Sequence, residues 1–81
     1  MDAQGVARTA ADVTEPQRGL RAVVALRKLA DSLEYLQVRA ALERGMSWAD
    51  IGDHLDVTRQ AVHKKYARRI AGDHGNERNA R

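Results

Sequence analysis

The chain has 81 residues, a formal net charge of +3 at pH 7, no cysteine and no phenylalanine. This length suits one small domain, and the absence of cysteine excludes disulfides and thiolate metal sites, which is typical of a reducing cytoplasm. No apolar run approaches the roughly 20 residues that cross a membrane, and the first residues lack the basic and apolar regions of a signal peptide. We therefore expect a cytoplasmic protein with an aliphatic core.

The first predicted helix is long and follows a segment without periodicity. Residues 1–14 show no regular apolar pattern and are predicted to form a flexible N-terminal arm. Pro16 suits the first turn of a helix, and Thr14 is placed to cap it. Gly45 favours a helix end, so we predict one helix over about residues 15–44.

The apolar residues of this long helix alternate four and three positions apart, which is a heptad seam. Its C-terminal half is expected to pack on the rest of the domain, whereas its N-terminal half has no evident partner within the chain. We therefore predict a homodimer through the long helix, with fraying or folding back of the N-terminal half as the alternative. The predicted dimerisation residues are Leu26, Leu29, Leu33 and Leu36.

Two shorter helices are predicted after the long one. Ser47 begins the first, over residues 47–55, with an acidic residue three positions later that completes a capping box. Thr58 is the expected N-cap of the second, which covers about residues 58–71. The inward face of this second helix is predicted from apolar residues that recur every four positions, namely Val62, Tyr66 and Ile70.

The remaining residues set the fold class. Residues 72–81 are polar and are predicted to form a flexible tail. No segment has the alternating pattern of a β-strand. The expectation is an all-α fold with one domain over residues 15–71.

The stretch IGDHLDVTRQAVHKK meets the steric needs of two helices that cross at a tight turn. Gly52 is the small residue at the crossing, Val57 is placed to plug the turn, and Val62 faces back as an anchor. This stretch resembles the helix-turn-helix of sigma-factor region 4 and of many short bacterial transcriptional regulators. The resemblance implies a tri-helical DNA-binding domain without a wing. It departs from the family at Asp56, where glycine is usual, and at Lys65, where an aliphatic residue is common.

Acidic and basic residues occupy separate parts of the same stretch. Residues 46–56 contain three aspartates and no Lys or Arg, whereas residues 57–71 contain five Lys or Arg residues and no acid. By the resemblance, the base-contacting positions of the second short helix are Arg59, Gln60, His63 and Lys64. The predicted phosphate contacts are Ser47, Thr58, Lys65, Arg68 and Arg69.

These observations favour a homodimeric transcriptional regulator that binds specific double-stranded DNA in the nucleoid. One alternative is an architectural, nucleoid-associated protein of low specificity, and another is a coiled-coil protein-interaction module. We expect no enzyme, because there is no nucleophile–base set and no Gly-rich phosphate loop. The three histidines lack metal-ligand spacing, and no cofactor or small-molecule substrate is indicated.

Overall fold

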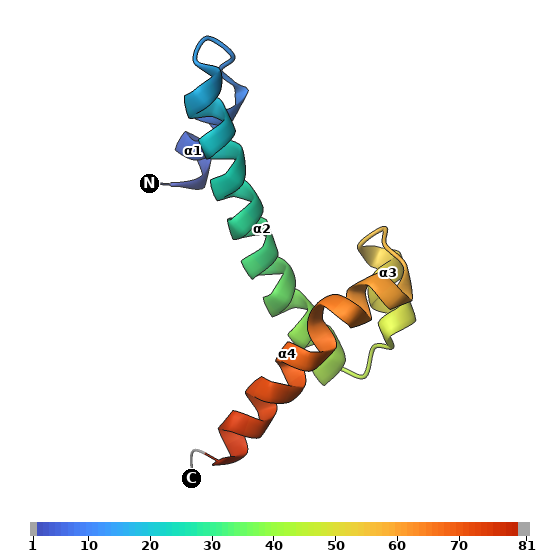
Figure 1. Ribbon diagram of the computed structural model, residues 1–81. Helices are drawn as coiled ribbons and strands as arrows, with labels where there is room; N and C mark the ends of the chain where they lie inside the picture. Colours follow the sequence, from blue (N-terminus) through green and yellow to red (C-terminus); the bar gives the residue numbers. More distant parts are fainter. Residues whose placement is uncertain (1, 80–81) are drawn as a thin grey trace. The chain divides into compact units, whose positions relative to one another are not determined.

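The computed structural model describes residues 2–79, with residues 74–79 described by their backbone alone. The regular secondary structure of this part of the chain is entirely α-helical (Figure 1), which confirms the all-α prediction. No helix within residues 2–79 is both long and apolar enough to cross a membrane. The helices are α1 (Ala3–Ala11), α2 (Pro16–Glu43), α3 (Trp48–His54) and α4 (Arg59–Asn79). They form two compact units, Met1–Glu34 and Tyr35–Arg81, and α2 contributes to both.

The N-terminal segment is a helix, so the prediction of a flexible arm over residues 1–14 is wrong for the described residues. The Asp2 carboxylate caps α1 by accepting a hydrogen bond from the Gly5 N–H at 2.7 Å. Val6 is buried and gives α1 its apolar contact. The sequence pattern missed α1 because the helix is built largely from alanine and buries one larger apolar side chain. Met1 lies outside the described residues.

Within the first unit, α1 packs on the first turns of α2. Gly19 is buried there, and a Cβ atom on it would lie 3.4 Å from the Asp12 carbonyl oxygen and 3.7 Å from that of Thr9. The first turns of α2 therefore do have a partner within the chain, contrary to expectation. The other apolar side chain buried in this unit is that of Ala22 on α2.

A tight turn joins α1 to α2. The Asp12 carboxylate accepts hydrogen bonds from the Thr14 hydroxyl at 2.7 Å and from the Thr14 N–H at 3.0 Å. These two bonds lower the pKa of the Asp12 carboxyl. Thr14 therefore stabilises the turn and does not cap α2 as predicted, and α2 begins at Pro16.

The C-terminus of α2 ends in a Schellman motif. Gly45 adopts a φ of 85°, in the left-handed region that favours glycine. Its N–H bonds the Leu42 carbonyl at 3.0 Å, and the Met46 N–H bonds the Ala41 carbonyl at 3.0 Å. The prediction that Gly45 stops the long helix is confirmed.

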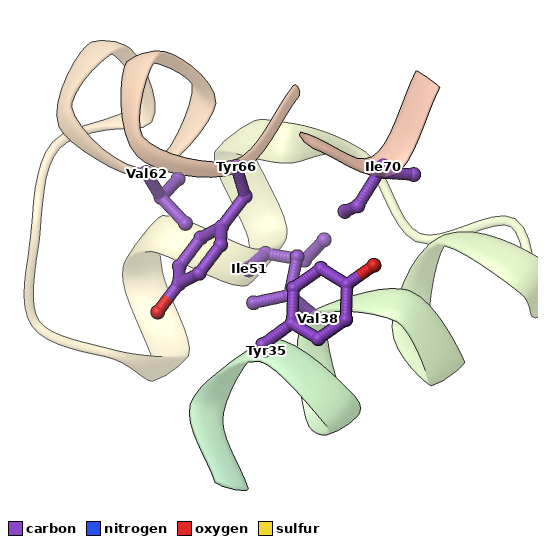
Figure 2. Packing of buried hydrophobic residues seen from close by; sticks show 6 residues of the cluster. All are labelled: Tyr35, Val38, Ile51, Val62, Tyr66 and Ile70. Atoms are coloured by element: carbon purple, nitrogen blue, oxygen red, sulfur yellow. The ribbon is translucent and has the colours of Figure 1, made fainter. Parts of the chain in front are cut away.

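The core of the second unit joins α2, α3 and α4, as Figure 2 shows. The three residues predicted to face inward from the last helix are all buried, so that prediction is confirmed. The core is not purely aliphatic, because Tyr35 and Tyr66 pack with their ring centroids 6.0 Å apart. The chain's one tryptophan, Trp48, packs against the same cluster, so every aromatic residue lies in this unit. The buried residues are Tyr35, Val38, Ile51, Val62, Tyr66 and Ile70.

The last helix continues past residue 71, where a flexible tail was predicted to begin, and reaches Asn79. The Tyr35 hydroxyl donates a hydrogen bond to the Asp73 carboxylate, which raises the pKa of Tyr35. The Arg69 guanidinium lies 3.7 Å from the centroid of the Tyr35 ring. These contacts hold α4 to α2, and the helical cost of Gly72, about 1 kcal/mol, is too small to end the helix. Residues 80–81 lie outside the described residues.

Candidate functional site

The turn between α3 and α4 is a second Schellman motif. Asp56 occupies its left-handed position with a φ of 57°, as expected for the residue that replaces glycine there. The Val57 N–H bonds the Gly52 carbonyl at 2.9 Å, and the Asp56 N–H bonds the Asp53 carbonyl at 3.3 Å. The prediction that the Val57 side chain plugs the turn is wrong, because that residue is 44% exposed. Its backbone N–H, and not its side chain, closes the turn.

Gly52 brings the two backbones together. A Cβ atom at this buried position would lie 2.8 Å from the Val57 carbonyl oxygen and 3.2 Å from the Arg59 nitrogen. The prediction of a small residue at the crossing is therefore confirmed. The first residues of α4 are positioned by direct contact between backbones, which leaves them little freedom to shift.

The N-terminus of α3 carries its own negative charge. The Ser47 hydroxyl accepts a hydrogen bond from the Asp50 N–H at 3.0 Å, and the Asp50 carboxylate accepts one from the Ser47 N–H at 3.4 Å. The predicted capping box is thus confirmed. The Asp50 carboxylate adds negative charge at this helix N-terminus, which disfavours an anion there, and the phosphate contact at Ser47 stays a prediction.

The start of α4 presents a polar surface. The Thr58 hydroxyl accepts a hydrogen bond from the Ala61 N–H at 3.0 Å, so Thr58 acts as the predicted N-cap. The His63 ring lies edge-on to the Trp48 ring, with the ring centroids 5.0 Å apart, which ties this part of α4 to α3. The four side chains predicted to contact bases are all exposed, namely Arg59, Gln60, His63 and Lys64.

The predicted phosphate contacts on α4 have different surroundings. Arg68 is exposed and follows Gln60 and Lys64 at intervals of four, on the side of α4 away from its buried residues. The Lys65 ammonium lies 5.3 Å from the centroid of the neighbouring Tyr66 ring. Arg69 stacks on Tyr35, which holds its charge on the side of α4 that faces α2.

Sequence reasoning missed two residues that shape this surface, Tyr35 and Asp73. Tyr35 stands three and seven positions before the apolar residues Val38 and Leu42, a helical spacing that could have placed it in the core. No comparable signal marked Asp73, because its partner lies 38 positions away in the chain. Among the described residues, no three or more His, Cys, Asp or Glu side chains are grouped to hold a metal ion.

No protein-family model matches the chain, and no curated protein or solved structure matches it either. The function is therefore inferred from the exposed face of α4 and from the turn that positions it.

Proposed function

We propose that the chain binds specific sequences of double-stranded DNA, with α3 and α4 acting as a helix-turn-helix and α4 entering the major groove. The observation that carries the proposal is the division of α4 into two faces. One face is buried in the core, and the other presents polar and basic side chains with no acid between residues 57 and 71. A helix with these properties fits the width and the negative potential of the major groove.

In this proposal, side chains from the first two turns of α4 contact the base edges. Arg59 can donate two hydrogen bonds to the acceptors of guanine, and Gln60 can pair with adenine through its amide. Lys64 lies one turn beyond Gln60 on the same exposed face. His63 has less freedom to turn toward a base, because its ring packs against Trp48.

Backbone contacts come from Thr58, Lys65 and Arg68, which flank or follow the base-reading positions. Arg69 joins them only by leaving the Tyr35 ring, so its share of the affinity is smaller. Ser47 has the least support, because the Asp50 carboxylate is beside it. These contacts position the protein on the duplex without reading sequence.

The chain acts as a homodimer in this proposal. Several leucines of α2 are exposed, including three of the four predicted at the dimer seam. Two copies of α4 would enter successive major grooves about 34 Å apart on an inverted repeat. This arrangement is that of a small transcriptional regulator in a bacterial nucleoid.

The test is a fluorescence anisotropy titration of selected duplexes over a range of salt concentrations. Lys64→Ala should weaken binding about 10-fold and reduce the slope of log K against log salt by about 1. Lys28→Ala is the matched control, because it removes the same charge from an exposed position on α2 and should leave binding unchanged. The proposal would be refuted if no duplex is bound at low salt, or if the affinity does not change with the salt concentration.

A second candidate is an architectural protein of low specificity, which is favoured by the contact of His63 with Trp48 because it reduces the base-reading set. Arg59→Ala distinguishes the two functions. It should change the order of preference among duplexes if the protein reads bases, and weaken all duplexes alike if it coats DNA.

A further inference from the structure

A stripe of exposed leucines runs along α2. Leu29, Leu33 and Leu36 are 41%, 53% and 59% exposed, and their spacing places them at successive core positions of a heptad repeat. Leu26, which precedes them in the same repeat, is partly covered. We call Leu29, Leu33 and Leu36 the leucine stripe. Apolar side chains in this register are typical of a helix that pairs with another helix.

The residues that flank the leucine stripe are uncharged except for Arg39, which borders Ala40 at the C-terminal end. The other flanking heptad positions are occupied by small or neutral side chains, whereas in coiled coils they usually hold Glu and Lys, which select the partner by charge. Arg39 is thus one cation at the end of an otherwise neutral border. In an antiparallel pair with Leu33 opposite Leu36, Arg39 of each copy lies at the level of Ala30 of the other, so a second copy brings no like charge beside it. The flanking residues are Ala25, Ala30, Ser32, Gln37 and Arg39.

Helix α1 covers the seam on the N-terminal side of the leucine stripe. Gly19 and Ala22 continue the heptad register toward the start of α2, and both are buried within the first unit. Carbonyl oxygens at the end of α1 lie within 4 Å of a Cβ placed on Gly19. In a parallel pair, the α1 helices of both copies would occupy the seam at the same level and force the two α2 helices apart.

We infer that two copies pair through the leucine stripe in antiparallel orientation, with α1 as the element that excludes the parallel arrangement. The inference rests on the homodimer proposed above and adds its geometry. Leu33 of one copy lies against Leu36 of the other, and Leu29 lies against Ala40. In this register Glu43, the last residue of α2 in the second copy, lies opposite Leu26, so the paired part of α2 does not reach Gly19 and Ala22.

Because the chain has no cysteine, one introduced cysteine carries a spin label at a single known position. In this register the two-fold axis crosses α2 between Leu33 and Leu36. Labels on Arg21→Cys are therefore separated by about 40 Å along the helix in the antiparallel dimer, from a rise of about 1.5 Å per residue. In a parallel dimer the same labels lie within roughly 25 Å, set by the distance between two packed helices and the reach of the labels. Pulsed dipolar spectroscopy measures this distance, and the shorter value would overturn the inference.

Sedimentation of two further variants tests the interface. Leu33→Glu should be monomeric at a concentration where the parent chain is dimeric, with unchanged far-ultraviolet circular dichroism. Leu20→Glu is the matched control, because Leu20 is more exposed (66%) yet lies outside the leucine stripe, and it should remain dimeric. A parent chain that sediments as a monomer, or a Leu20→Glu variant that dissociates, would contradict the inference. These measurements use no DNA, so their failure is distinct from a failure of the anisotropy titration.

Discussion

Replacing Gly52 by alanine should destabilise the protein even though alanine is the better helix former. The new Cβ atom would lie 2.8 Å from the Val57 carbonyl oxygen and 3.2 Å from both the Arg59 nitrogen and the Thr58 carbonyl carbon. All three are backbone atoms, so the clash is relieved only by moving the turn. Overpacking of this kind costs about 1–3 kcal/mol, and the helical preference for alanine offsets about 0.5–1 kcal/mol of it.

The net loss in the free energy of unfolding is therefore roughly 0.5–2 kcal/mol, which lowers Tm by about 2–16 °C in a chain of this size. Thermal unfolding followed by circular dichroism measures it. Gly72→Ala is the matched control, because nothing lies within 4 Å of a Cβ at that helical position, and it should raise the stability by about 0.5–1 kcal/mol. A Gly52→Ala variant as stable as the parent would refute the close approach of the two backbones.

Two more predictions follow from backbone conformation and from pH. Asp56→Gly should raise the free energy of unfolding in urea by about 0.5–1 kcal/mol, because glycine adopts the observed φ of 57° without strain. An Asp56→Ala variant as stable as the Asp56→Gly variant would contradict this. The raised pKa of Tyr35 means that folding favours its protonated form. This contribution is complete below the ordinary value of about 10 and is lost as the pH rises through the folded value. Between about pH 9 and pH 11, the Tm of Tyr35→Phe should therefore fall less than the Tm of the parent. Equal falls in Tm for the two proteins would argue against the Asp73 contact.

The local chemistry of helix ends was the most predictable part of the fold. Each helix end combines a residue type with a fixed spacing, and short-range hydrogen bonds explain its role. The examples are the Ser47–Asp50 capping box, the N-cap Thr58 and the helix stop Gly45. The inward face of α4 was equally accessible, because a repeat of four leaves one helical face apolar. Contacts that depend on distant residues were not predictable.

Helix α1 and the end of α4 show why. The apolar face of α1 consists of alanines and one valine, which were not recognised as a face that packs, and its cap, Asp2, was not distinguished from other polar residues near the N-terminus. The extension of α4 depends on Asp73, whose partner Tyr35 belongs to another helix. Within the candidate site, the exposure of four α4 side chains followed from the inward face, whereas the contact of His63 with Trp48 required the packing of α3.

The confinement of all aromatic residues to the second unit has an optical consequence. Tryptophan fluorescence and near-ultraviolet circular dichroism report on Trp48, Tyr35 and Tyr66, and therefore on the unit from Tyr35 onward alone. Far-ultraviolet circular dichroism detects the helices of both units. Coincident melting curves from the two methods would show that the units unfold together, and separate curves would give the stability of each without any label.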